Sequence, residues 1–235
     1  MRAYEIQGAG GVDALAISQR FEPDPGPGQV KVKIHASSIN YRDLLMIEDP
    51  LSRGLELPRI PNSDAAGEIV AIGSGVNSVK VGDRVVGCFF QNWKSGLITA
   101  DGMAGALGGA LDGVLSEYVL LEEAGVVQVP DHLSFGEAAT LPCAALTAWH
   151  ALVERGGIKA GDTVLLLGTG GVSIFGLQFC ALHGVRTIIT SSSDEKLQRA
   201  KTLGAWETIN YLKSPDWQKV VQSLTDGSGV DHVLE

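Results

Sequence analysis

Residues 163–173 read TVLLLGTGGVS, and this stretch decides the fold of the second half of the chain. Its apolar run predicts a buried strand over 163–167, and the glycine turn leads directly into a helix predicted over 171–183. The turn, G-x-G-G-x-S, is a variant of the dinucleotide-binding pattern G-x-G-x-x-G. Gly168 permits the tight turn, and Gly170 lets a pyrophosphate approach the backbone where free helix N–H groups favour an anion. Glycines also end strands without binding anything, but the flanking strand and helix favour a cofactor site.

Short strands and helices alternate around this turn. The pattern predicts strands over 186–190 and 230–234, with helices over 194–203 and 215–225. A long helical stretch rich in Ala and Leu is expected over 135–153, with an interruption near Pro142. Strands separated by amphipathic helices are typical of βαβ units, so a parallel sheet is expected.

The tip of the second strand indicates which nicotinamide cofactor binds. Sites for NAD usually place Asp or Glu there to bind the ribose 2′-hydroxyl. Here Ser191 and Ser192 follow the strand, Lys196 lies one turn into the next helix, and Asp194 and Glu195 are interpreted as charges of its first turn. Hydroxyls with a lysine suit a 2′-phosphate, so NADP(H) is favoured and NAD(H) is the alternative. A serine cap beside a solvated lysine is the competing structural interpretation.

The first half of the chain is richer in strands. Residues 29–36 alternate apolar and polar side chains with period two, which predicts a half-buried strand. Further short apolar runs occur at 66–73, 81–87 and 115–121, and strands at this spacing predict a barrel-like antiparallel module. The glycine-rich stretch 91–113 predicts a long loop, which in a compact domain is either functional or disordered.

Composition excludes several classes of partner. The chain has 235 residues, is 45% hydrophobic and carries a formal net charge of −9. Negative charge repels phosphate backbones and anionic lipid, so neither nucleic acid nor a membrane surface is an expected partner. The 3 cysteines are widely spaced and predict neither a disulfide framework nor a CxxC metal pair. This cysteine usage favours a reducing cytoplasm, and the N-terminus has no signal-peptide core.

Five sequence motifs occur together in the order typical of one enzyme superfamily. They are SSINYRDLL (37–45), IPNSDAAGEIVAIGSGVNSVKVGDRVV (60–86), DGVLSEYVLL (112–121), ATLPCAALTAWHAL (139–152) and the glycine turn. On these motifs the chain resembles the medium-chain dehydrogenase/reductase superfamily, in its zinc-free, quinone oxidoreductase-like branch. The resemblance implies a GroES-like β-barrel substrate domain over 1–125, followed over 126–235 by a Rossmann domain with a doubly wound parallel sheet. That sheet is expected to be incomplete here, in a partial chain whose full-length form is a homodimer.

The resemblance also places the catalytic zinc ligands of the alcohol dehydrogenases on this sequence. The first cysteine ligand matches Asn40, the histidine matches Ser63 with Asp64 as its neighbouring acid, and only the second cysteine is retained, as Cys143. Zinc prefers thiolate, imidazole or carboxylate ligands in a tetrahedron. The family's four-cysteine structural cluster would fall in the glycine-rich loop, which has no such cluster. No zinc is therefore expected at either site.

The expected reaction follows from the missing metal. Hydride removal from a simple alcohol benefits from a Lewis acid, whereas hydride addition to a quinone or an α,β-unsaturated carbonyl spreads charge that a few hydrogen-bond donors can stabilise. We therefore expect an oxidoreductase that transfers hydride from NADPH to such a small-molecule substrate. An alcohol dehydrogenase of the same superfamily and a non-catalytic nucleotide-binding fragment are the alternatives.

Position-by-position matching to the family gives the candidate site residues. The expected catalytic residues are Asn40, Arg42, Asp43 and Asp64. The expected cofactor contacts are Tyr41, Thr147, Gly168, Gly170, Gly171, Val172, Ser191, Ser192, Lys196 and Tyr211. Both sets, with Trp93 and Cys143, are expected to meet in a cleft between the two domains. The ordinary structural alternatives are helix caps for Asn40 and Asp43, a core hydroxyl for Thr147, and a surface aromatic for Tyr211.

Overall fold

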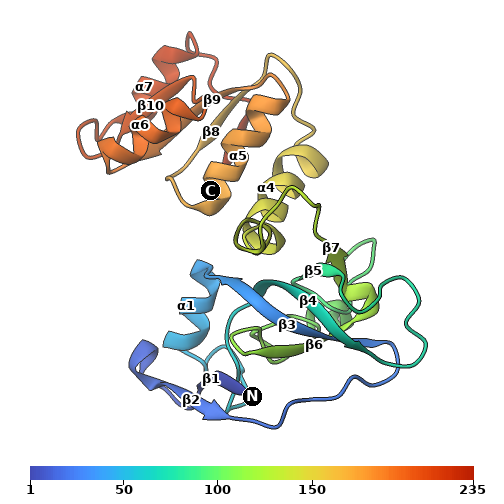
Figure 1. Cartoon of the computed structure of the whole chain (residues 1–235). Helices are drawn as coiled ribbons and strands as arrows, with labels where there is room; N and C mark the ends of the chain where they lie inside the picture. The colour runs from blue at the N-terminus through green and yellow to red at the C-terminus, as the bar shows by residue number, and fades with distance from the viewer. The chain divides into compact units, whose positions relative to one another are not determined.

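A curled antiparallel sheet organises the first part of the computed structural model, which describes residues 1–235 (Figure 1). Its strands are β3 (Gln29–Ser38), β4 (Asp64–Ile72), β5 (Arg84–Gly87), β6 (Tyr118–Glu122) and β7 (Val126–Gln128). Their spatial order is β6-β3-β4-β5-β7, so β3 pairs with both β4 and β6. Register shifts between β3 and β4 bend the strands, which helps the sheet to curl.

The predicted alternation of β3 decides which side of this sheet forms the core. Val30 and Val32 are buried, whereas Lys33, which directly follows Val32, is exposed. The same core contains Ile69 of β4 and Val85 of β5. The predicted antiparallel module is therefore confirmed, with an aliphatic interior enclosed by the curl of the sheet.

A hairpin and a helix complete this part of the chain. β1 (Arg2–Ile6) and β2 (Leu15–Gln19) form a separate antiparallel pair, with a short helix η1 (Gly11–Ala14) between them. Helix α1 (Tyr41–Glu48) follows β3, and its Ile47 shares a small apolar core with Ile6 of β1. The periodicity of the sequence predicts none of these elements, because β2 and α1 are short and mixed in polarity.

The glycine-rich loop is anchored over its second half. It contains a short helix α2 (Ala100–Met103), and Leu107 is buried in the β core. The backbone N–H of Gly113 donates to the carbonyl of Ile60 at 2.7 Å. A Cβ added at Gly113 would lie 2.1 Å from the backbone oxygen of Asn62, so only glycine allows this approach. In contrast, the residues at 92–101 are exposed.

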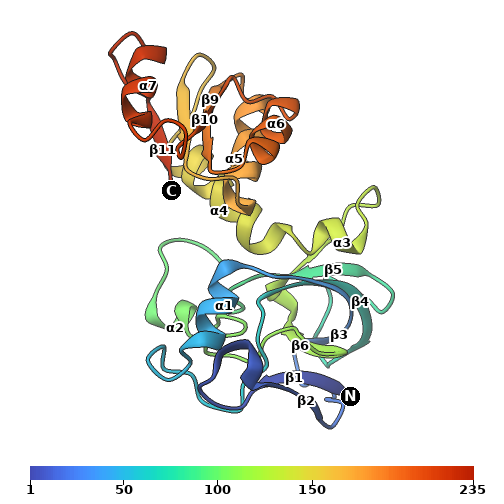
Figure 2. The same ribbon diagram turned by 90° about the vertical axis from the view of Figure 1, so that its left-hand side faces the viewer.

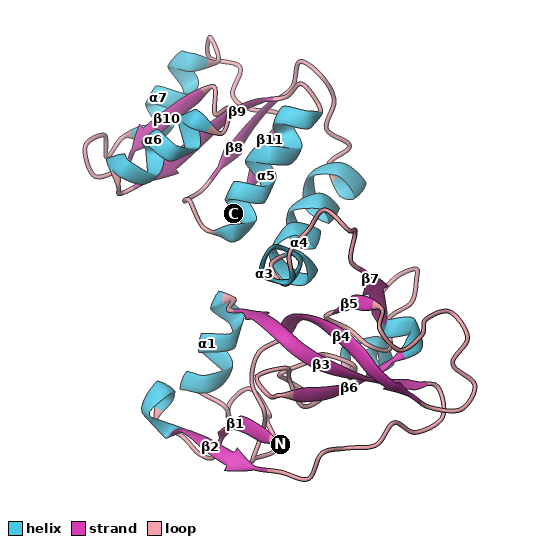
Figure 3. Ribbon diagram, in the orientation of Figure 1, coloured by secondary structure: helices cyan, strands magenta, loops and turns pink.

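A four-stranded parallel sheet forms the second part of the chain (Figure 2). Its elements are β8 (Thr163–Leu166), α5 (Gly171–Leu182), β9 (Arg186–Ser191), α6 (Asp194–Thr202), β10 (Glu207–Asn210), α7 (Trp217–Leu224) and β11 (His232–Leu234). The strand order is β10-β9-β8-β11, with all three pairings parallel. Val164 and Leu166 of β8 pack with α5 and α6, while Leu165 packs with α7. Helices therefore cover both faces, which confirms the predicted doubly wound sheet (Figure 3).

Helical segments connect the two sheets along the chain. The predicted stretch over 135–153 is interrupted at 139–140, two residues before Pro142, and α3 (Phe135–Ala138) precedes the interruption. A continuous helical run follows and consists of η3 (Leu141–Ala145), α4 (Leu146–Trp149) and η4 (His150–Arg155). Pro142 lies in its first turn, where a missing N–H is tolerated. None of the chain's helices combines the length and apolar character that a bilayer span requires.

Two compact units result, Met1–Cys143 and Ala144–Glu235. Helix α3 belongs to the first unit because it packs against β3 and β4, where the Phe135 ring stacks on His35 with centroids 4.4 Å apart. The boundary between residues 125 and 126 was predicted from the family resemblance and not from the compactness of the units. It stays a prediction.

Candidate functional site

The glycine turn joins the ends of two neighbouring strands. Gly168 has a φ of +79°, which explains why this position requires glycine. Its backbone N–H donates to the Thr190 hydroxyl at 3.1 Å, and the Thr169 hydroxyl lies 3.2 Å from that of Ser191. The tips of β8 and β9 are thus held together by the hydroxyl groups of Thr169, Thr190 and Ser191. Of these three, only Ser191 is predicted from the sequence.

The turn leaves open space at the start of α5. Gly170 is the N-cap of this helix, and a Cβ added at Gly168 or Gly170 would meet no atom within 4 Å. The Ser173 hydroxyl donates to the carbonyl of Leu167 at 3.0 Å, which fixes the turn against the first helical turn. A bare backbone at the positive end of a twelve-residue helix suits a pyrophosphate, so the geometry fits the predicted cofactor.

Polar residues gather where β9 and β10 end. Ser193 caps α6, and its hydroxyl accepts the backbone N–H of Lys196 at 3.3 Å. The N–H of Tyr211 donates to the carbonyl of Ser191 at 3.1 Å, which brings Tyr211 beside the strand tip. Ser192 and Lys196 are exposed, and the Lys196 amino group forms no ion pair. The predicted 2′-phosphate residues are therefore gathered at one edge of the sheet.

Two further predicted cofactor contacts lie on packed helices of the same unit. Thr147 is exposed on α4, so the alternative of a core hydroxyl does not apply. Val172 lies in the first turn of α5, against which α4 packs. A Cβ added at Gly171 would lie 3.3 Å from the Cβ of Ala144, so this glycine allows the close approach of the two helices.

In the first unit, Asn40 and Asp43 cap the start of α1, which is the ordinary structural role expected for them besides the catalytic one. Asn40 is the N-cap of α1, and its backbone N–H donates to Asp43 Oδ2 at 2.8 Å. Asp43 is 1% exposed, and burial raises the pKa of its carboxyl against the opposing effects of the Asn40 N–H and Arg42. The side-chain nitrogen of Asn40 is buried without a hydrogen-bond partner.

Asp64 connects three segments of the first unit. Its Oδ1 accepts the Ser63 hydroxyl at 2.6 Å, and its Oδ2 accepts the backbone N–H of Cys143 at 2.8 Å. Burial raises the pKa of this carboxyl, although the bonds from Ser63 and Cys143 and a weaker effect of Asn40 oppose the rise. Asp64 therefore ties the start of β4 to the start of the helical run that contains Cys143.

Arg42 and Tyr41 take separate directions at the start of α1. Arg42 Nη1 donates to the carbonyl of Leu107 at 2.8 Å and lies 3.3 Å from Asp43 Oδ1. Its guanidinium lies over the Phe89 ring, 4.9 Å from the centroid. These contacts hold the glycine-rich loop to α1, whereas Tyr41 is 76% exposed.

The positions that match the zinc ligands of alcohol dehydrogenases hold groups that fit a zinc ion poorly. Asn40 and Ser63 supply an amide and a hydroxyl, and both oxygens of Asp64 accept hydrogen bonds from the protein. No group of three or more His, Cys, Asp or Glu side chains lies close enough together to hold a metal. Trp93 lies in the glycine-rich loop, where its Nε1 donates to the carbonyl of Gly96 at 3.1 Å, and not in the β core. The expected cleft, in which these residues would face Gly170 from the other domain, stays a prediction.

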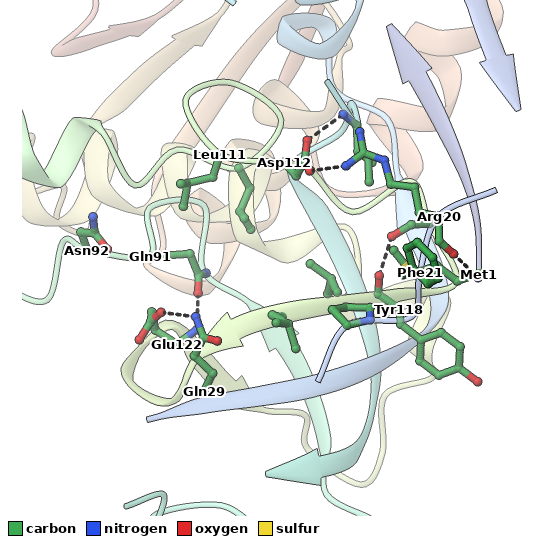
Figure 4. A pocket seen from close by; sticks show the side chains of 17 residues that line it. Met1, Arg20, Phe21, Gln29, Gln91, Asn92, Leu111, Asp112, Tyr118 and Glu122 are labelled. Carbon is green, nitrogen blue, oxygen red and sulfur yellow. Dashed lines mark hydrogen bonds and ion pairs between the residues drawn. The ribbon is translucent and has the colours of Figure 1, made fainter. Parts of the chain in front are cut away.

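A separate cavity of about 420 Å³ lies entirely within the first unit (Figure 4). Several of its polar side chains are paired with one another. Arg20 binds Asp112 at 3.0 Å, and Gln29 donates to Glu122 at 3.0 Å. The backbone N–H of Glu122 in turn donates to Gln91 at 3.0 Å. None of the predicted site residues lines this cavity, so it is distinct from the candidate site.

Two family models match the chain. The alcohol dehydrogenase GroES-like domain matches residues 26–131, and the zinc-binding dehydrogenase domain matches residues 171–235. The first match agrees with the predicted substrate domain and its antiparallel fold.

Individual relatives cover nearly all of the chain or the whole of it. A zinc-type alcohol dehydrogenase-like protein of Schizosaccharomyces pombe is 47% identical over 228 residues, which are 96% of this chain and 66% of the relative. A putative alcohol dehydrogenase from Sinorhizobium meliloti 1021 is 44% identical with a TM-score of 0.93, and the match covers 100% of this chain and 69% of that one. Escherichia coli quinone oxidoreductase complexed with NADPH is 27% identical with a TM-score of 0.83, over 98% and 64% of the two chains.

The chain thus spans slightly less than two thirds of the length of the Schizosaccharomyces pombe relative. Fold, motif order and similarity agree along its whole length. The chain belongs to the medium-chain dehydrogenase/reductase superfamily, in its quinone oxidoreductase-like branch.

Proposed function

We propose that the full-length protein is an NADP(H)-dependent oxidoreductase that reduces a quinone or an α,β-unsaturated carbonyl without a metal. The observation that carries the proposal is the arrangement at the ends of β8 and β9, which hydrogen bonds hold together. There an open glycine turn begins a helix, and the unpaired Lys196 lies at the strand tip. The similarity to a quinone oxidoreductase complexed with NADPH supports the same cofactor here.

The second unit supplies the groups that would hold the cofactor. Backbone N–H groups from Thr169 to Val172 suit the pyrophosphate, because the Gly168 N–H already binds Thr190 and no side chain occupies the space above Gly168 and Gly170. Ser191, Ser192, Lys196 and Tyr211 would bind the 2′-phosphate through hydroxyls and one positive charge. Thr147 would contact the nicotinamide end. When bound, the cofactor supplies the hydride, and the protein orients it.

The first unit would supply the groups around the substrate. Asn40, Arg42, Asp43 and Asp64 are proposed to line or support the reacting centre, with Asn40 offering a side-chain amide donor. Hydrogen-bond donors can stabilise an enolate or phenolate, which carries a delocalised charge. The poor fit of Asn40 and Ser63 to zinc supports a reaction without a metal. Homodimer formation and a cytoplasmic location are proposed for the full-length protein.

The test of cofactor choice compares the dissociation constants of NADPH and NADH. Replacing Lys196 by Ala is expected to weaken NADPH binding selectively by about 1–3 kcal/mol, because a charge-assisted bond to the 2′-phosphate is lost. Lys219→Ala is the matched control, since Lys219 pairs with Asp216 at the start of α7. A wild-type preference for NADH, or equal losses for both cofactors, would contradict the assignment.

The test of the reaction uses the full-length protein with a panel of quinones, enones and simple alcohols. Oxidation of NADPH with the conjugated acceptors is the expected result. Alcohol oxidation together with one chelator-resistant zinc per chain would favour an alcohol dehydrogenase. Cofactor binding without turnover of any substrate would favour a non-catalytic nucleotide-binding protein.

A further inference from the structure

The carboxylate of Asp194 is fully engaged beside the proposed 2′-phosphate site. It is the first residue of α6, directly after the Ser193 cap. The side-chain nitrogen of Asn210 donates to Asp194 Oδ1 at 2.7 Å, and the Lys213 amino group forms an ion pair with Oδ2. These two partners lower the pKa of the Asp194 carboxyl, Lys213 having the larger effect, so the group is ionised at neutral pH.

Asn210 is itself fixed at the end of β10. Besides Asp194, its side-chain nitrogen donates to the carbonyl of Ser192 at 3.2 Å. Its side-chain oxygen accepts the N–H of Leu212 at 3.0 Å. The Asp194 carboxylate is therefore held toward the turn after β10, next to the same strand tip that carries Ser191 and Ser192.

A carboxylate at this edge of the sheet has a strong effect on cofactor choice. In NAD sites it accepts the ribose hydroxyls, and it repels a 2′-phosphate, which carries a double negative charge. Asp194 would impose this repulsion if its charge were uncompensated. Lys213 supplies a compensating charge and leaves Lys196 without a competing carboxylate partner.

We infer that Lys213 is a specificity-determining residue, which neutralises Asp194 and thereby allows the edge of the sheet at Lys196 to accept a 2′-phosphate. The inference rests on the proposed preference for NADP(H). It assigns Lys213 an indirect role through Asp194, in contrast to the direct contact proposed for Lys196.

The experiment measures dissociation constants of NADPH and NADH by titration calorimetry on the 235-residue chain and three variants. Lys213→Met is expected to weaken NADPH about fivefold, as for a partly exposed charge interaction, and to leave NADH within about twofold. Adding Asp194→Asn to Lys213→Met is expected to restore NADPH affinity to within about twofold of the wild type. The loss in Lys213→Met should also shrink at high salt.

The control is Lys219→Met, which removes an ion pair of similar exposure at the start of α7 and should change neither constant. The inference is overturned if Lys213→Met changes nothing or weakens both cofactors equally. It is also overturned if the loss persists with Asp194→Asn, because Lys213 would then contact the phosphate directly. The wild-type dissociation constants are compared first. A wild-type chain that prefers NADH overturns the proposed function itself.

Discussion

Asp43 and Asp64 are buried carboxyls whose pKa values are both raised, chiefly because burial disfavours the charged form. The folded chain therefore keeps their protons to higher pH than the unfolded chain does. The stability associated with this proton uptake is fully present below the ordinary value of 3.8, and it is lost as pH rises through the folded pKa.

Replacing Asp64 by Asn is expected to remove its part of this pH dependence. The wild type should lose unfolding free energy relative to Asp64→Asn as the pH is raised from about 4 to about 7. Urea unfolding at several pH values measures the difference. Glu195→Gln, at an exposed position on α6, is the control and should follow the wild type. Parallel curves for the wild type and Asp64→Asn would contradict the buried-acid interpretation.

At the same scale, the candidate site shows which residues a sequence can reveal. Gly168 and Lys196 stand in a local pattern of strand, turn and helix, so their place at the strand tips could be predicted. Thr190, Asn210 and Lys213 could not, because Thr190 reaches the site through the pairing of β8 with β9, and the other two through the pairing of β9 with β10. No spacing along the chain records those pairings.

At the scale of elements, apolar periodicity predicted the longer strands and helices to within a few residues. Helices α5 and α6 begin as predicted, because a glycine turn and a serine cap mark their starts. β10 was missed, since its sequence ETIN has one isoleucine and gains its stability from β9. The hairpin of β1 and β2 was missed because eight residues, including η1, separate its strands.

The glycine-rich loop leads to a prediction about packing. Replacing Gly113 by Ala places a Cβ 2.1 Å from the Asn62 oxygen and 2.2 Å from the Pro61 oxygen, so the backbone must shift. We expect a loss of about 1–3 kcal/mol in unfolding free energy, as for an overpacked core. Thermal or urea unfolding measures it. The control Gly8→Ala should be nearly neutral, because nothing lies within 4 Å of the added atom. Equal stabilities of the two variants would refute this account.

At the scale of the whole molecule, the division into Met1–Cys143 and Ala144–Glu235 separates the proposed cofactor contacts other than Tyr41 from the buried acids. Saturating NADPH should stabilise the folded chain by about 2.7 kcal/mol at a hundredfold excess over the dissociation constant. Within the chain, the backbone amides at 168–174 and 190–197 are expected to gain protection from hydrogen exchange.

Hydrogen exchange followed by mass spectrometry, with and without NADPH, checks this localisation. Exchange at residues 29–38 serves as an internal control, because β3 lies within the first sheet. Protection confined to the first unit would place the cofactor elsewhere, in contradiction to the glycine-turn site.

The exposed tip at 92–101 has a practical consequence for handling the protein. It lies between segments that pair on both sides, since β5 pairs with β4 before the loop and β6 pairs with β3 after it. A protease cut after Lys94 would therefore produce a nicked protein whose two fragments remain interleaved in one sheet. The same position is a permissive point for inserting a peptide tag, because the inserted chain would extend into solvent without breaking a strand pairing.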